Sequence, residues 1–465
     1  MQEFDLIVIG SGPGGYTGAI RAAQLGMKVA CIEKRTTLGG TCLNVGCIPS
    51  KALLNSSEKY YEVMHKLSDV GVIASAKLDL PKMMSKKNQV VAELCKGIES
   101  LFAKNKIIRI DGTAKLLSSN IVEINNEKTT TQILAKNILI ATGSDIIEIP
   151  NIVVDEQFIV SSTGALNLTE VPEKLVVIGG GYIGLELGSV WNRLGSQVTI
   201  IEYADTIVPA LDKEIINQFA KILQKQSIEL RLNTKVVSAE KKAGKVLLQL
   251  EDLKSSTAQQ ITADIVLLAV GRKANANNLG LDKLTIELDK QNRIIVNKYF
   301  QTTINNIYAV GDVIAGPMLA HKAEEEAIAA VEIMAGLAGH VNYNLIPSVI
   351  YTWPEVASVG FTEEQLKEAK VEYKVGKFPF LANSRARTIG STDGIVKILA
   401  DSRTDKVLGA HIIGPDAGTL IAEMVAFMAF GAAAEDVART CHAHPTLSEA
   451  LKEAALAIEK RTINI

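Results

Sequence analysis

Two cysteines, Cys42 and Cys47, lie five positions apart in the segment GGTCLNVGCIPSK, a spacing that suits redox chemistry. An ideal helix would hold their Cα atoms about 8–9 Å apart, whereas a disulfide needs less than about 7 Å. A bond between them therefore requires a distorted turn, and Gly46 supplies the conformational freedom. Because such a bond opens readily, the pattern favours a catalytic disulfide over two unrelated thiols. A metal site is disfavoured, since no second Cys or His pair stands nearby in the sequence.

A possible base and its carboxylate stand close together near the C-terminus, in the segment CHAHPTLSE. Thiol–disulfide chemistry needs a base because the thiolate is the nucleophile, and histidine titrates near neutral pH. His444 could act as that base, with Glu449 fixing its tautomer as in a catalytic triad. Thr446 and Glu449 equally match a helix capping box, so the local sequence leaves both roles open. A zinc site formed by Cys441, His442 and His444 is disfavoured.

The pattern Gly-x-Gly-x-x-Gly occurs twice, 169 residues apart, each time between a short apolar run and a helical stretch. A second apolar run ending in Glu follows at the same offset in both copies, so each copy predicts a β-α-β unit. The residues of the first copy are Gly10, Gly12, Gly15 and Glu33, and those of the second are Gly179, Gly181, Gly184 and Glu202.

These residue types suit the binding of a dinucleotide. The first glycine permits a tight turn, the second admits a pyrophosphate, and the third lets the helix pack closely on the strand. The helix N-terminus offers N–H groups to the phosphates, and the final Glu accepts hydrogen bonds from ribose hydroxyls. Two sites imply two dinucleotides, for which FAD and NAD are the natural pair. NAD is favoured over NADP because Glu202 would repel a 2′-phosphate and no Arg follows closely. The alternative is two tight turns without a ligand.

Length and composition describe a large globular protein. The chain has 465 residues, a net charge of −2 and 47% hydrophobic residues, which excludes a disordered or low-complexity protein and predicts about three domains. The near-neutral charge argues against nucleic acid as a partner, and no apolar run is long enough to span a membrane. Five scattered cysteines do not form a secreted disulfide scaffold. The acidic start of the chain argues against a targeting peptide, so we expect a cytoplasmic location.

The two glycine-rich units, the cysteine segment, Gly311-Asp312 and the terminal His-Pro-Thr-x-x-Glu together resemble the pyridine nucleotide–disulfide oxidoreductases. The resemblance covers essentially the whole chain. It implies an α/β fold with two Rossmann-like dinucleotide-binding domains, for FAD and NAD, and a C-terminal α+β dimerisation domain. The expected boundaries are 1–147 for the FAD domain, 148–271 for the NAD domain, 272–346 for a central FAD-contacting part and 347–465 for the interface domain, which includes an apolar helix over 420–433.

The resemblance also implies a set of cofactor-binding residues. It places Asp312 on the ribityl chain of FAD and the ammonium of Lys51 near the flavin, paired with Glu186. The helix that begins near His321 would stabilise negative charge on a reduced flavin through its dipole. The further residues expected at FAD are Gly112, Ala141, Thr142, Gly143, Met318, Leu319 and Ala320, and those expected at NAD are Glu186, Val236 and Gly271.

For activity, the resemblance implies oxidation of protein-bound dihydrolipoamide to lipoamide through the cysteine pair and FAD, with reduction of NAD. It selects His444 with Glu449 as the acid–base pair, acting across a homodimer with shared active sites, and makes His442 a support residue. The expected partner is the lipoyl domain of a dihydrolipoamide acyltransferase. Glutathione reductase, mercuric reductase and a non-catalytic docking flavoprotein fit the residues less well.

Overall fold

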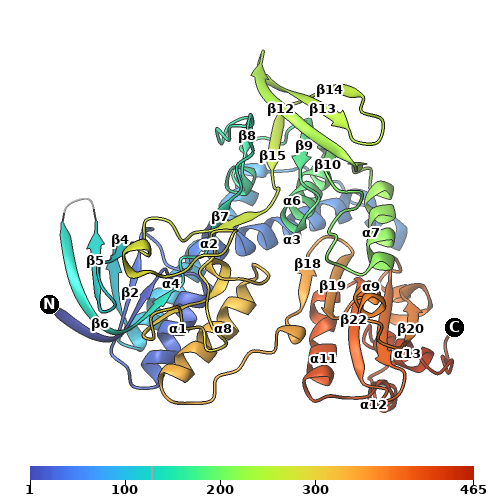
Figure 1. Cartoon of the computed structure of the whole chain (residues 1–465). Coiled ribbons are helices and arrows are strands. Elements are labelled where there is room, and N and C mark those ends of the chain that lie inside the picture. The colour runs from blue at the N-terminus through green and yellow to red at the C-terminus, as the bar shows by residue number, and fades with distance from the viewer. Residues whose placement is uncertain (127–128) are drawn as a thin grey trace. The chain divides into compact units, whose positions relative to one another are not determined.

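The computed structural model describes residues 1–126 and 129–465, which form two compact units. Each unit is assembled from separate stretches of the chain, coloured by position in Figure 1. Unit 1 comprises Met1–Leu53, Pro81–Ile147 and Gly271–Val341, and unit 2 comprises Leu54–Leu80, Glu148–Val270 and Asn342–Ile465. The expected boundaries of the four domains stay predictions.

Unit 1 is built around a sheet with the strand order β3-β2-β1-β6-β5-β4, in which β17 also pairs with β6. The strands β1, β2, β3, β6 and β17 are parallel, whereas β4 and β5 form an antiparallel edge. The bounds are β1 (Gln2–Ile9), β2 (Val29–Glu33), β3 (Ile108–Asp111), β4 (Thr113–Leu116), β5 (Ile121–Asn125), β6 (Thr130–Ile140) and β17 (Ile307–Ala309), with β7 (Ser144–Ile146) and β16 (Arg272–Ala274) forming a separate ribbon.

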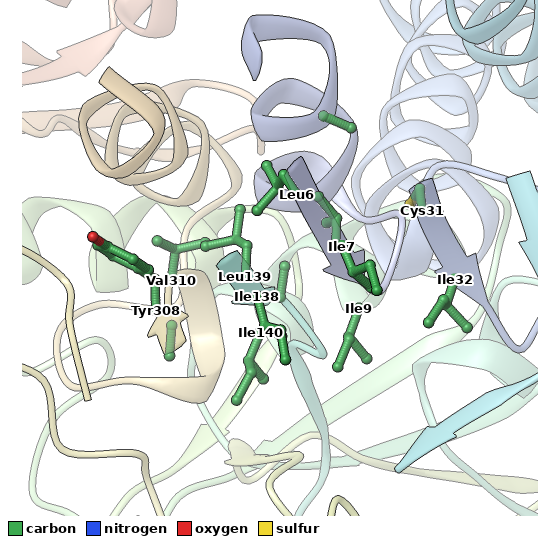
Figure 2. Close-up of a cluster of buried hydrophobic side chains, with 14 of the residues drawn as sticks. Leu6, Ile7, Ile9, Cys31, Ile32, Ile138, Leu139, Ile140, Tyr308 and Val310 are labelled. Carbon is green, nitrogen blue, oxygen red and sulfur yellow. The ribbon is translucent and has the colours of Figure 1, made fainter. Parts of the chain in front are cut away.

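The central strands of unit 1 are apolar on both faces, as parallel strands covered by helices must be. Figure 2 shows the core that they share, with side chains of β1, β2, β6 and β17 packed together. The helices of this unit are α1 (Pro13–Gln24), α2 (Gly40–Val45), the start of α3 (Cys47–His65), nearly all of α4 (Leu80–Lys104) and α8 (Ala320–Met334).

Helices α1 and α8 pack closely because small residues line their contact. A Cβ built at Gly14 would lie 3.3 Å from the Cβ of Ala323, and one at Gly18 would lie 3.4 Å from the Cβ of Ala327. Helix α8 therefore lies against the helix of the first glycine-rich unit.

Unit 2 contains the second dinucleotide-type sheet, with the parallel strand order β11-β10-β9-β15-β8. An antiparallel three-stranded meander follows β11 in the chain and is labelled in Figure 1. The strands are β8 (Ile159–Val160), β9 (Lys174–Ile178), β10 (Gln197–Ile201), β11 (Glu229–Arg231) and β15 (Ile265–Leu268), the meander is β12 (Thr234–Lys242), β13 (Lys245–Asp252) and β14 (Ala258–Ala263), and the helices are α5 (Ser162–Ala165), α6 (Tyr182–Arg193) and α7 (Lys213–Lys225).

The C-terminal part of unit 2 forms an antiparallel sheet with the strand order β18-β19-β22-β21-β20. Its strands are β18 (Ser348–Ile350), β19 (Glu355–Gly360), β20 (Tyr373–Pro379), β21 (Ile395–Asp401) and β22 (Val407–Gly414), and its helices are α9 (Glu363–Glu368), α10 (Ser384–Thr388), α11 (Ala417–Ala429), α12 (Ala434–Arg439) and α13 (Glu449–Ala457). Short 3-10 turns occupy Leu67–Val70, Asp282–Leu284, Gly311–Val313, Tyr343–Leu345 and Phe380–Ala382.

The expected fold class is confirmed, with two Rossmann-like sheets and a separate C-terminal α+β part. One helix differs from its expected bounds: α11 runs over Ala417–Ala429 rather than 420–433. It ends there because Gly431 adopts a left-handed conformation, with φ 71°, which closes a helix C-terminus. No helix among residues 1–126 and 129–465 is long and apolar enough to cross a membrane.

Candidate active site

The two glycine-rich turns have the same geometry, as the repeat predicts. Each first glycine follows a central strand, and each third glycine lies under the turn inside the following helix. A Cβ at Gly15 would lie 1.8 Å from the carbonyl oxygen of Gly10, and one at Gly184 would lie 2.3 Å from that of Gly179. Only glycine fits at these two helix positions, because the backbones of helix and turn are in direct contact.

The middle glycines leave space beside the turn. A Cβ built at Gly12 would meet only the Cα of Gly40, at 3.9 Å, and one at Gly181 would have no neighbour within 4 Å among the described residues. These two glycines are the N-caps of α1 and α6, and neither helix has a side-chain cap. The N–H groups of both first turns thus have no side-chain cap, which suits the binding of a pyrophosphate.

The two terminal acids brace their turns through the backbone. Glu33 accepts hydrogen bonds from the N–H of Ser11 (2.9 Å), from the Ser11 hydroxyl (2.6 Å) and from the N–H of Arg35 (2.9 Å). Glu202 accepts from the N–H of Gly180 (2.7 Å) and from that of Ala204 (2.8 Å). Oε1 of Glu33 and both oxygens of Glu202 can each accept a further bond, so both acids remain suited to ribose hydroxyls.

Two of the expected FAD residues at the strand ends of unit 1, Asp312 and Thr142, are held by hydrogen bonds to residues that the sequence did not predict. The Ser144 hydroxyl donates to Asp312 (2.5 Å), and the Arg272 guanidinium donates to the hydroxyl and carbonyl oxygens of Ser144 (both 2.7 Å). The Thr142 hydroxyl donates to the carbonyl of Asn275 (2.7 Å). This network holds the turn after β6 and the aspartate after β17 at one edge of the sheet.

Two residues that hold this edge were not predicted from the sequence. Lys322 and Glu326 form an ion pair (3.0 Å) in which both side chains are 0% exposed. Glu326 accepts from the N–H of Gly311 (2.8 Å), and the Lys322 ammonium donates to the Gly311 carbonyl (3.2 Å). Their i,i+4 spacing is that of an ordinary solvated pair. The alanines flanking them on the same helix face were the only signal of burial.

The two cysteines meet across an interrupted helix. Gly46, with φ −139° and ψ −116°, separates α2 from α3, and a Cβ there would lie 2.9 Å from the carbonyl oxygen of Thr41. The distorted turn expected at Gly46 is thus confirmed. A side-chain hydrogen bond joins Cys42 and Cys47, and this bond together with burial raises the pKa of the Cys42 thiol, against the opposing charge of Lys51.

His444 and Glu449 also meet, through a hydrogen bond of 2.9 Å between Nδ1 and Oε1. The other oxygen of Glu449 accepts from the N–H of Thr446 (2.8 Å), so the carboxylate serves both the imidazole and the backbone before α13. Partial burial acts to raise the pKa of Glu449, but these hydrogen bonds outweigh it and lower that pKa. The imidazole of His444 is 68% exposed and open to a substrate.

The remaining predicted residues are distributed over both units. Gly10 and Ala141 are in backbone contact, since a Cβ at Gly10 would lie 2.5 Å from the Ala141 oxygen, and the N–H of Gly112 donates to the Glu33 carbonyl (2.9 Å). The other FAD candidates, Gly143, Lys51 and 318–321, also belong to unit 1.

The NAD candidates are less closely grouped. Glu186 is buried on α6 and accepts from the N–H of Tyr351 (3.0 Å), and Val236 lies on β12 at the start of the meander. Gly271 belongs to unit 1 rather than unit 2. Its contact with NAD, and the pairing of Lys51 with Glu186, stay predictions.

Comparison with known proteins identifies the family to which the chain is similar. Residues 4–327 match the family described as pyridine nucleotide-disulphide oxidoreductase, and residues 346–455 match its dimerisation domain. The chain is 56% identical to human mitochondrial dihydrolipoyl dehydrogenase, with 98% of this chain and 90% of that protein covered. It is 53% identical to mitochondrial dihydrolipoyl dehydrogenase 1 of Arabidopsis thaliana, covering 100% and 92%.

Solved structures give the same picture of the fold. The flavoprotein disulfide reductase RclA of Escherichia coli is 28% identical, with a TM-score of 0.85 over 98% of this chain and 99% of that one.

These relatives contradict the expected cytoplasmic location, because both named dihydrolipoyl dehydrogenases are mitochondrial proteins. The expectation was wrong because it relied on the first residues of the chain. The residue types at the start of a sequence do not by themselves report the compartment.

Proposed function

Since this chain belongs to the pyridine nucleotide-disulphide oxidoreductase family, we propose that it oxidises protein-bound dihydrolipoamide to lipoamide and reduces NAD to NADH. FAD and NAD are its cofactors. The observation that carries the proposal is the contact between Cys42 and Cys47 across the break at Gly46. It supplies a dithiol–disulfide couple within the unit that also holds the first dinucleotide turn.

The proposed reaction is a thiol–disulfide exchange. Glu449 holds a proton on Nδ1 of His444, which leaves Nε2 to accept a proton from one thiol of dihydrolipoamide. The resulting thiolate attacks the sulfur of Cys42, the Cys42–Cys47 bond breaks, and Cys47 leaves as a thiolate. The second substrate thiol then displaces Cys42, which leaves carrying the proton of that thiol, and the lipoamide disulfide closes. Two electrons and two protons have then left the substrate.

The chemistry that bound FAD would supply is acceptance of the electron pair from the reduced cysteines and hydride transfer to NAD. The residues proposed to hold FAD are the turn at Gly10, Gly12 and Gly15, with Glu33 and Asp312. Those proposed to hold NAD are the turn at Gly179, Gly181 and Gly184, with Glu202.

The dimerisation domain gives the protein its homodimeric form. We propose that His444 and Glu449 of one subunit serve the cysteine pair of the other. His444 lies within the matched dimerisation domain and is largely exposed, which suits a group that acts outside its own chain. The proposed macromolecular substrate is the lipoyl domain of a dihydrolipoamide acyltransferase, whose long lipoyl arm would deliver the dithiol.

The test is a pair of steady-state assays on the purified holoenzyme. We expect NAD reduction with dihydrolipoamide and little activity with glutathione disulfide plus NADPH.

Cys42→Ser and Cys47→Ser should each abolish dihydrolipoamide oxidation while FAD stays bound. Cys441→Ser, which replaces an exposed thiol outside the pair, should remain active. His444→Gln should lower the rate by about 10²–10⁴-fold. Activity only in the glutathione assay would overturn the proposal.

A further inference from the structure

A second His–Glu pair, His442 with Glu423, begins two residues before the first in the chain. His442 is two residues before His444, in the loop between α12 and α13, and its side chain is only 4% exposed. Its neighbours Cys441, Ala443 and His444 are exposed. His442 Nδ1 lies 3.0 Å from the carbonyl oxygen of Thr440, and Nε2 lies 2.7 Å from Oε1 of Glu423 on α11. The loop therefore alternates one inward imidazole with one outward imidazole.

The two partners of His442 determine its protonation state. A carbonyl oxygen and a carboxylate are both acceptors, so the ring satisfies both contacts only when each nitrogen carries a proton. The hydrogen bond to Glu423 raises the pKa of His442, while burial and the charge of Lys452 on α13 oppose the rise. The contacts and the raised pKa both favour the imidazolium form of His442 under the exposed loop.

Other contacts fix the same loop on both sides of His444. Thr440 offers its carbonyl to His442 and also to the Lys452 ammonium (3.3 Å). The carbonyl of Thr446 accepts from the Asn383 amide (3.0 Å). The charge of His442 also favours the ionised form of Glu449. Position and charge at His442 therefore both bear on the His444–Glu449 pair.

We propose that protonated His442, clamped to Glu423, is a positioning residue that holds His444 in the geometry needed to deprotonate the substrate thiol. This inference rests on the proposed function, because it assigns His442 and Glu423 a role only through the base at His444. A base misplaced by about 1 Å can lose roughly 10²-fold in rate, so the support is expected to appear in turnover rather than in binding.

The proposed clamp has a defined dependence on pH. The pKa of His442 is raised in the folded protein, so its charge and both hydrogen bonds are present at lower pH and are lost as pH rises through that raised pKa. The groups that face it are Glu423 on α11 and Lys452 and Glu449 on α13. Without the charge of Glu423, His442 should lose its proton, and with it both hydrogen bonds, at a lower pH.

The experiment compares Glu423→Gln and His442→Gln with the wild-type holoenzyme. We expect kcat for dihydrolipoamide oxidation to fall about 10-fold or more in each, with little change in KM for NAD. In Glu423→Gln, the alkaline limb of the kcat profile should shift to lower pH. NADH-dependent reduction of ferricyanide, which needs no thiol base, should stay unchanged. Glu435→Gln, a matched change at an acid paired with Arg439 and Arg461, should leave all rates unaltered.

The outcomes separate the two proposals. If wild-type protein oxidises dihydrolipoamide and both variants match it in rate and pH profile, the positioning role is overturned and the proposed function stands. A uniform loss of kcat, with no shift of the pH profile in Glu423→Gln, would also overturn the role of the charge. A wild-type protein without dihydrolipoamide activity overturns both proposals. In the double variant, the losses should be far from additive, since both side chains act through one contact.

Discussion

The two β-α-β units share their backbone chemistry but differ in what surrounds it. In both, the terminal Glu receives the N–H after the first glycine, and the third glycine touches the first. In the first unit the residue after Gly10 is Ser11, whose hydroxyl adds a third bond to Glu33, and Glu33 is 5% exposed. In the second unit that residue is Gly180, and Glu202 is only half-buried.

The middle glycine of the motif is also more closely surrounded in the first β-α-β unit, at Gly12, than in the second, at Gly181. Gly40, at the start of α2, approaches Gly12 so closely that a Cβ at Gly40 would lie 2.5 Å from the Gly12 Cα. Helix α8 covers the other side of α1. The described residues place nothing comparable at Gly181. The same turn is thus enclosed in one unit and open in the other, which suits a resident FAD and an exchanging NAD.

The largest effect is expected at the buried Lys322–Glu326 ion pair of α8, the helix that packs against the first β-α-β unit. Glu326→Ala leaves the Lys322 ammonium fully buried without its carboxylate, at a cost of about 3–5 kcal/mol of unfolding free energy and with loss of FAD. Denaturant unfolding and flavin absorbance measure this. Glu332 lies on the same helix as Glu326 and forms a partly exposed pair with Arg21 of α1. Glu332→Ala breaks this pair and should cost less than about 1 kcal/mol of unfolding free energy. Equal losses would contradict the assigned role of burial.

The third glycines test whether the two turns can be disrupted separately. Gly15→Ala places a Cβ 1.8 Å from a backbone oxygen, and Gly184→Ala places one at 2.3 Å, so we expect losses of about 3 and 2 kcal/mol respectively. Gly15→Ala should release FAD. Gly184→Ala should retain FAD but lose NAD reduction, as measured by flavin absorbance and steady-state rates. Release of FAD by Gly184→Ala would show that the units are not independent.

The terminal acids should differ according to their partners. Glu33 accepts from three donors, and Glu33→Gln turns an NH₂ group toward at least one of them. The binding free energy of FAD should therefore weaken by about 2 kcal/mol. The measurement is the fraction of apoprotein that forms on dialysis. Glu202→Gln should raise KM for NAD about 10-fold and narrow the preference for NAD over NADP, because the charge that repels a 2′-phosphate is gone. An unchanged preference would remove Glu202 from the specificity argument.

The smallest effect is expected at the residue after the first glycine. Ser11→Ala removes one hydrogen bond to Glu33 and makes the first unit resemble the second, at a cost of about 1 kcal/mol, seen as a lower Tm of the holoenzyme. Gly180→Ser is the reverse change. Its Cβ would lie 2.9 Å from Ile207 Cγ2, so the variant should lose affinity for NAD rather than gain a hydrogen bond from the new hydroxyl to Glu202. A gain in affinity would contradict the steric argument.

Much of the candidate site was predictable because its motifs are local. The glycine spacing, the terminal acids and the break at Gly46 act over a few residues, where backbone sterics decide the outcome. Other features were not predictable. Lys322 and Glu326 have the spacing of a surface pair, and only the packing of α8 buries them. Glu449 fitted two roles in the sequence, and the structure pairs it with His444, whereas the capping box does not form because α13 begins at Glu449 itself, with Ser448 as its N-cap.

The sequence by itself determined the order of the motifs, the two β-α-β units and the residue types that could carry redox and acid–base chemistry. The tertiary structure decided which distant groups meet, such as Ser144 with Asp312, 168 residues apart, and Glu423 with His442, 19 residues apart. Backbone geometry follows from neighbours in the chain, so spacing predicts it. Burial, protonation and hydrogen bonding depend on what packing brings together, so no local pattern predicts them.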